Sequence, residues 1–139
     1  EDTPASYVID TIHNFQPDRI GHGIHSIEDM KAVELIKEKG VTLEVNPWSN
    51  YLTNSVPKIE AHPLKKLFDL GLRVTINSDD PEVLETNVNN EYRIAHEVLG
   101  MSMDDIALCN RFAFEASFIE ATAKQRIWDR YFKEPSNPN

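Results

Sequence analysis

Short strand segments alternate with helical segments over the first 77 residues, and this order limits the possible folds more than any other feature of the sequence. Apolar residues recur with helical spacing in residues 5–15, 27–39 and 61–70. Short and largely apolar strand segments occupy residues 18–23, 41–45 and 72–77. Such an order is typical of parallel strands that the intervening helices bury on both faces.

An open sheet of three parallel strands leaves unpaired edges, which a closed barrel avoids. Three helical segments follow the last strand, at residues 88–99, 102–114 and 120–132. We therefore expect an α/β fold in which residues 1–139 are the C-terminal portion of one TIM-type (β/α)8 barrel domain of a metal-dependent hydrolase. This portion would contain about the last three βα units plus the terminal helices. Because the chain begins with Glu1 and not with Met, we expect it to be processed or to be part of a longer protein.

Local signals predict where helices begin and where they are interrupted. Ser26 stands where an N-cap would begin the helix at 27–39, and Ser102 opens a capping-box pattern. A polar loop is expected to begin at residues 46–50, after the second strand. The polar, proline-rich tail at residues 133–139 is expected to fray.

Each predicted strand ends in polar residues. His22 lies between two glycines after the first strand, residues 46–50 follow the second, and Asp79 and Asp80 follow the third. Functional sites of parallel α/β proteins form at the carboxyl ends of the strands, so these side chains are expected to converge. If the extended backbone continues, Asp79 and Asp80 point in opposite directions, one toward a metal and the other toward a ligand. Pro81 then ends the strand.

A histidine and two carboxylates on one rim are typical of a metal-assisted hydrolase. Zinc binds His nitrogen and carboxylate oxygen, and a catalytic zinc keeps one position for water, whose pKa it lowers. The alternative for His22 is a histidine hydrogen-bonded in a glycine turn. Trp48 is expected to pack in the core, although it could line a pocket. Surface or helix-capping positions are expected for the other four histidines, His13, His25, His62 and His96.

Charge and cysteine content exclude several classes of partner. The formal net charge of −9 argues against binding nucleic acid or an anionic membrane through a basic face. The single Cys109 can form no internal disulfide, which fits a reducing compartment and predicts a cytoplasmic protein. No apolar run approaches the length of a membrane span.

Three motifs together resemble one known family. They are Arg-Ile-Gly-His-Gly-Ile-His-Ser at residues 19–26, Pro-Trp-Ser-Asn-Tyr-Leu-Thr at residues 47–53 and Ser-Asp-Asp-Pro at residues 78–81. In order and spacing they resemble the late motifs of adenosine deaminases, which belong to the amidohydrolase superfamily of zinc-dependent (β/α)8 barrels. The resemblance covers nearly the whole chain. It implies the fold expected above and a purine substrate.

The resemblance also implies a role for individual residues. Asp79 resembles the aspartate that ligates zinc, and Asp80 its neighbour that hydrogen-bonds a purine ring nitrogen. His22 resembles the histidine that orients the attacking water. Glu1 lies where the family has the glutamate that protonates the ring, and Glu44 resembles an acid that holds the histidine.

In that family the other zinc ligands come from a His-x-His and a His-x-Gly-Glu motif, both of which would lie upstream of residue 1. The chain alone is therefore expected to hold no tight zinc site and to need the missing N-terminal part of the barrel as its partner. The implied reaction is zinc-dependent hydrolysis of adenosine or deoxyadenosine to inosine or deoxyinosine and ammonia. The alternatives are a deaminase of adenine, of a methylthio-nucleoside or of a futalosine-type nucleoside, and an inactive fragment that serves as a binding module.

Overall fold

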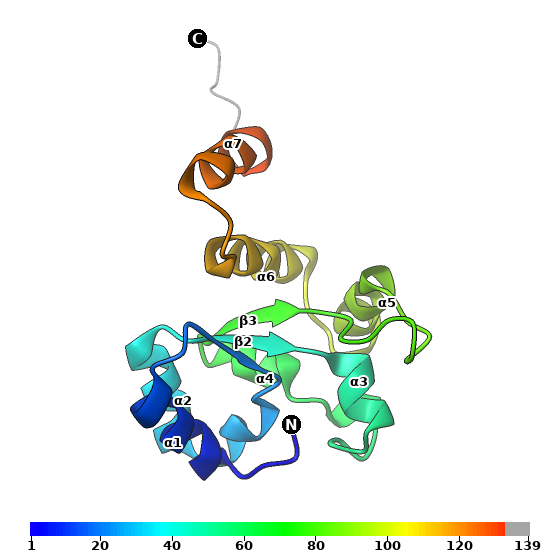
Figure 1. Cartoon of the computed structure of the whole chain (residues 1–139). Coiled ribbons are helices and arrows are strands. Elements are labelled where there is room, and N and C mark those ends of the chain that lie inside the picture. The colour runs from blue at the N-terminus through cyan, green and yellow to red at the C-terminus, as the bar shows by residue number, and fades with distance from the viewer. Residues whose placement is uncertain (133–139) are drawn as a thin grey trace.

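Three short parallel strands form the centre of the molecule in the computed structural model, which describes residues 1–132 (Figure 1). They are β1 (Arg19–Gly21), β2 (Thr42–Val45) and β3 (Arg73–Ile76), and they pair in the order β1-β2-β3. Leu43 of β2 lies opposite Ile20 on one side and Val74 on the other. The predicted α/β class and the three parallel strands are confirmed.

Helices connect and follow the strands. The segments up to β3 are α1 (Ala5–Phe15), the 3-10 helix η1 (Ile24–Glu28), α2 (Met30–Lys39), α3 (Pro47–Leu52), the 3-10 helix η2 (Ile59–Ala61) and α4 (Leu64–Asp69). After β3 come α5 (Val88–Arg93), the π-helical turn η3 (Ile94–Val98), α6 (Met103–Ala116) and α7 (Ala121–Tyr131). In Figure 1, α6 lies beside β3, and α7 lies beyond α6, farthest from the sheet. None of the helices in residues 1–132 has the length and apolar character needed to cross a membrane.

The two faces of the sheet differ in polarity, because side chains alternate along each strand. One face carries Leu43, Val45 and Val74, which are fully buried against apolar side chains of the helices. The other face carries polar side chains at paired positions, among them Arg19, Thr42, Glu44, Arg73 and Thr75. The strands are therefore apolar on one face only, and the second face presents charge and hydroxyl groups, of which Thr42 and Thr75 are buried.

Two expectations about the connections are also wrong. Asp29, and not Ser26, caps α2, because its carboxylate accepts the Lys31 N–H at 2.9 Å. Ser26 lies within η1, and its buried hydroxyl has no hydrogen-bond partner among the described residues. The polar residues after β2 form α3, whose first residue is Pro47, a favoured helix-opening position.

The segments after β3 follow the predicted order. The helix expected at 88–99 is divided into α5 and the π-helical turn η3, whereas α6 begins with the predicted capping box of Ser102 and Asp105. Cys109 lies in α6 and is fully buried. The expectation of a frayed tail concerns residues 133–139, which lie outside the described residues.

Candidate active site

The turns after β1 and β3 bring His22 and Asp79 to the same edge of the sheet. The His22 N–H donates to the Glu44 carbonyl at 2.9 Å. The Asn77 N–H donates to the Val45 carbonyl, also at 2.9 Å. Beyond these bonds the chain leaves the sheet abruptly, because His22 and Asp79 both have φ of 56°, in the left-handed region. The backbone is therefore not extended through Asp79, so the condition for opposite directions of Asp79 and Asp80 is not met.

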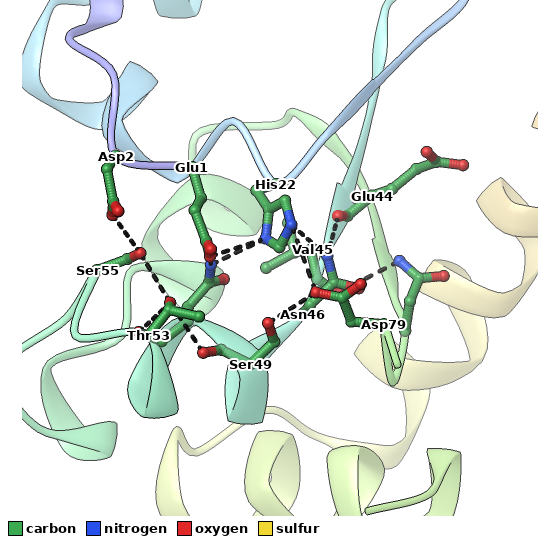
Figure 2. A network of polar contacts seen from close by, with 12 residues as sticks. Glu1, Asp2, His22, Glu44, Val45, Asn46, Ser49, Thr53, Ser55 and Asp79 are labelled. Carbon is green, nitrogen blue, oxygen red and sulfur yellow. Dashed lines mark hydrogen bonds and ion pairs between the residues drawn. The ribbon is translucent and has the colours of Figure 1, made fainter. Parts of the chain in front are cut away.

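The imidazole of His22 lies between two carboxylates (Figure 2). Its Nδ1 is 3.4 Å from Oε2 of Glu1, and its Nε2 is 3.6 Å from Oδ2 of Asp79. The side chains of Glu1 and His22 are about four-fifths buried, at 20% and 19% exposure, whereas that of Asp79 is 39% exposed. The structure thus brings together three residues that lie far apart in the sequence.

The first residues of the chain are held against the loop that follows α3. The Asp2 carboxylate accepts a hydrogen bond from the Ser55 hydroxyl, which also lies 3.0 Å from the hydroxyl of Thr53 (Figure 2). Next to this attachment, the side chain of Glu1 points toward His22 (Figure 2).

Helix α3 supplies the hydrogen bonds that hold the two carboxylates. The Asn50 amide donates to Glu1 Oε2 at 2.7 Å and lies 2.9 Å from His22 Nδ1. The Ser49 hydroxyl donates to Asp79 Oδ2 at 2.7 Å. Before the helix, the Asn46 amide donates to the Glu44 carbonyl at 3.0 Å and lies 3.1 Å from His22 Nδ1. Because Ser49 and Asn50 are adjacent on one short helix, a shift of α3 would move both carboxylates.

His62 lies directly behind Asn50, which makes the expectation of a surface position wrong for this histidine. It is 4% exposed, and its Nε2 lies 3.1 Å from Oδ1 of Asn50. Its Nδ1 accepts the N–H of Leu64 at 3.1 Å, which is the capping role expected for it. Burial and, to a lesser extent, the nearby His22 together lower the pKa of His62 to about 4. His62 is therefore neutral at physiological pH.

Two residues attach α3 to the segment that follows Asp79. The fully buried Glu91 accepts the backbone N–H of Trp48 at 3.0 Å and the hydroxyl of Thr86 at 2.8 Å. The half-buried indole of Trp48 donates to the Leu84 carbonyl at 3.1 Å, so the expectation that Trp48 packs in the core is wrong. Burial raises the pKa of the Glu91 carboxyl.

Asp80 and Glu44 lie apart from this arrangement. Asp80 is exposed, and no hydrogen bond or ion pair joins its carboxylate to another residue in the described range 1–132. The carboxylate of Glu44 pairs with Arg19 at 3.0 Å and does not reach His22. The expectation that Glu44 holds the histidine is correct only for its backbone carbonyl, which accepts the His22 N–H.

An open recess of about 360 Å³ lies at the carboxyl ends of the strands, with His22, Asn46, Asn77 and Asp79 among its walls. Of the two carboxylate oxygens of Asp79, only Oδ2 has a hydrogen-bond partner in the described part of the chain. Oδ1 therefore remains available to a cation. Within residues 1–132, however, no three His, Cys, Asp or Glu side chains form a group that could hold a metal ion.

A sequence profile of adenosine deaminase matches residues 1–134, which is nearly the whole chain. The chain belongs to the adenosine deaminase family. Adenosine deaminase of Plasmodium vivax is 37% identical over 115 residues, which are 83% of this chain and 32% of that protein. Adenine deaminase of Sinorhizobium medicae is 40% identical over 123 residues, which are 88% of this chain and 38% of that protein. The chain thus spans between about a third and two-fifths of the length of these curated relatives.

Solved structures show that this part of the adenosine deaminase family has the fold described above. The crystal structure of adenine deaminase from Arthrobacter aurescens matches with a TM-score of 0.85 and 31% identity over 91% of this chain and 39% of that one. An amidohydrolase from Burkholderia ambifaria, whose structure contains bound zinc, matches with a TM-score of 0.81 over 93% of this chain and 36% of that one. At 22% identity, this second likeness shows the fold alone.

Several residues of the site carried no recognisable signal in the sequence. Ser49 and Asn50 stood in the second strand-end segment, but nothing indicated which acid each would contact. Nothing in the sequence singles out Glu91, and its burial is visible only in the structure, where it bonds to Trp48 and Thr86. For His62, the following Pro63 and Leu64 are consistent with a helix cap, although only tertiary packing makes it buried.

Proposed function

We propose that the complete protein containing this chain is a zinc-dependent hydrolase that deaminates adenosine or deoxyadenosine to inosine or deoxyinosine and ammonia. The observation that supports this most is the position of His22 between the carboxylates of Glu1 and Asp79, at the carboxyl ends of parallel strands. Hydrolytic removal of an amino group needs a group that aligns water and a group that protonates the ring. One histidine flanked by two acids offers both groups at one edge of the sheet.

Each residue has a distinct proposed role. Asp79 would be one ligand of zinc, through the oxygen that Ser49 does not occupy. Zinc, when bound, supplies an activated water at neutral pH. His22 would orient that water through its Nε2, which faces Asp79. Glu1, held by Asn50, would donate a proton to a nitrogen of the purine ring, and Asp80 would hydrogen-bond another ring nitrogen from its exposed position.

The test uses the complete protein and two variants of the site. In Asp79→Ala, bound zinc measured by elemental analysis should fall well below one equivalent, and adenosine deamination should fall by more than about 100-fold. In Glu1→Gln, zinc should be retained while kcat falls about 10²- to 10⁴-fold, the usual contribution of a general acid. The matched control is Glu34→Gln, because Glu34 is an exposed acid of α2.

A second candidate function is deamination of the free base adenine. The relatives support it, because curated adenine deaminases match this chain as well as curated adenosine deaminases do. Turnover of adenosine, deoxyadenosine, adenine and a methylthio-nucleoside, measured as ammonia release, separates the candidates. A kcat/KM for adenine at least tenfold above that for adenosine would reject the first candidate.

A binding module without chemistry is the third candidate, and an incomplete metal group within residues 1–132 is expected of it and of the enzyme alike. It predicts that Asp79→Ala leaves zinc content, ligand binding and stability unchanged. Loss of zinc from that variant would reject it.

A further inference from the structure

Asn50 and His62 form a second layer behind the candidate catalytic residues, and the proposed function assigns no role to either. Both are polar and almost completely buried, with exposures of 0% and 4%. Burying an amide and an imidazole costs free energy unless their hydrogen-bonding groups are satisfied. Every polar atom of both side chains has a partner, so the arrangement of donors and acceptors can be deduced.

The backbone of Leu64 determines the proton position on His62. The Leu64 N–H donates to His62 Nδ1 at 3.1 Å, so this nitrogen must carry a lone pair. A neutral imidazole then has its proton on Nε2. The pKa of His62, about 4, keeps the ring neutral over the physiological range. Nε2 is therefore a donor toward Asn50.

The proton position on His62 in turn determines the orientation of the Asn50 amide. His62 Nε2 lies 3.1 Å from Oδ1 of Asn50, so the oxygen of the amide must face His62. The NH2 group must then face the opposite side. There it has two acceptors for its two hydrogens, Glu1 Oε2 at 2.7 Å and His22 Nδ1 at 2.9 Å.

This orientation also determines which nitrogen of His22 carries the proton. Because the Asn50 amide donates to His22 Nδ1, that nitrogen is an acceptor, and the ring proton lies on Nε2. Nε2 is the nitrogen that faces Asp79 and the recess. The Asn46 amide nitrogen lies 3.1 Å from Nδ1 and 3.5 Å from Nε2, so the assignment rests on Asn50 alone.

We propose that His62 is a positioning residue that locks the amide of Asn50, so that this one amide holds the Glu1 carboxylate and selects the Nε2–H form of His22. The role rests on the proposed function, since it concerns groups assigned there to proton donation and water orientation. Within residues 1–132, His62 has hydrogen bonds to Asn50 and Leu64 and none to Glu1 or His22. It acts only through Asn50, and this makes the proposal testable by combining variants.

The activity test uses the complete zinc-loaded protein with adenosine. His62→Leu removes the donor to Asn50 while filling a similar volume, and kcat should fall about tenfold with KM changed less than about twofold, as for a lost hydrogen bond that orients a buried group. His62→Gln can place an amide N–H near the same oxygen and should restore kcat to within about threefold of wild type. Bound zinc should remain at one equivalent in both variants, because neither replaces a proposed ligand.

The decisive comparison is the double variant. If His62 acts through Asn50, then His62→Leu should cost less than about twofold in kcat once Asn50→Ala is present. A full tenfold loss in that background would mean that His62 merely supports the fold, and the proposal would be overturned. An unchanged kcat in His62→Leu alone would overturn it as well.

A spectroscopic measurement tests the proton positions without activity. In protein labelled with 15N-histidine, the His62 Nδ1 should appear as a nitrogen without an attached proton, and its Nε2 as protonated, throughout pH 5.5–8. A protonated Nδ1 on His62 would reject the proposed lock. Wild-type protein that deaminates no adenine compound would reject the proposed function and this role together, whereas an active wild type with kinetically silent His62 variants would reject the role alone.

Discussion

The carboxylate of Glu91 accepts the backbone N–H of Trp48 at 3.0 Å, although 43 positions separate the two residues in the sequence. Trp48 is the second residue of α3, and the N–H groups of a first helical turn have no partner within the helix. Glu91 therefore caps α3 from a different part of the chain. Since α3 also carries Ser49 and Asn50, this hydrogen bond supports the side chains that hold Asp79 and Glu1.

Removing the Glu91 carboxylate should destabilise the protein. Glu91→Ala leaves a buried N–H and a cavity, and we expect a loss of about 3 kcal/mol in the free energy of unfolding. Glu91→Gln keeps an acceptor for Trp48 and can donate to Thr86, so it should cost about 1 kcal/mol. Urea unfolding measures both, with the exposed Glu97→Gln as control. Equal losses for the Gln and Ala variants would contradict the capping role.

The buried His62 should make stability depend on pH. Its pKa is about 4 in the folded protein and about 6.5 in an unfolded chain, so between these values only the unfolded state is protonated. Stability is therefore fully present above about pH 6.5 and is lost as pH falls toward 4, by about 3 kcal/mol in total. The difference in unfolding free energy between wild type and His62→Gln, measured from pH 7 to pH 4, should show this change. The control variant His13→Gln, at an exposed position of α1, should not produce this change.

The indole of Trp48 should stabilise the segment after Asp79. Its hydrogen bond to the Leu84 carbonyl is the side-chain link from α3 to this exposed turn. Trp48→Phe keeps most of the ring packing against Tyr51 and removes only the donor, at a cost of about 1 kcal/mol. Amide hydrogen exchange at residues 82–86 should accelerate in this variant while exchange in β2 stays unchanged. Unchanged exchange at 82–86 would show that the bond is dispensable.

The left-handed backbone at Asp79 should make glycine the best tolerated replacement. A side chain in this conformation costs about 1–2 kcal/mol, which glycine avoids. Asp79→Gly should therefore be about 1 kcal/mol more stable than Asp79→Ala, although both lose the carboxylate. Thermal unfolding of the two variants gives the comparison, and the same pair at Asn77, outside the residues with positive φ, should favour alanine.

The sequence predicted the order of elements well because that order depends on local patterns. Apolar spacing and glycine stops placed α1, α2 and the three strands to within a few residues. The polarity of the second face of the sheet was harder to predict, because Arg19 and Arg73 are the first residues of strands that otherwise look apolar. Their common face appears only when the strands are paired in register.

The sequence predicted which chemical groups belong to the site, but it did not predict how they are arranged. His22 and Asp79 were identified from their places after strands, and Glu1 from a family resemblance. Their backbone conformations were not, since a positive φ depends on how each turn leaves the sheet. The hydrogen bond from Asn50 to Glu1 could not be predicted either, because 49 positions separate the two residues and no local pattern connects them.

The shared left-handed conformation of His22 and Asp79 has a consequence for natural and laboratory selection. At both positions the backbone conformation favours glycine, whereas the proposed chemistry requires the His or Asp side chain. A library of variants ranked only by thermal tolerance should therefore enrich glycine at these two positions and lose turnover as it does so. A library ranked by turnover should retain His and Asp there and acquire thermal tolerance through substitutions at other positions. The two screens should therefore differ first at these two turns.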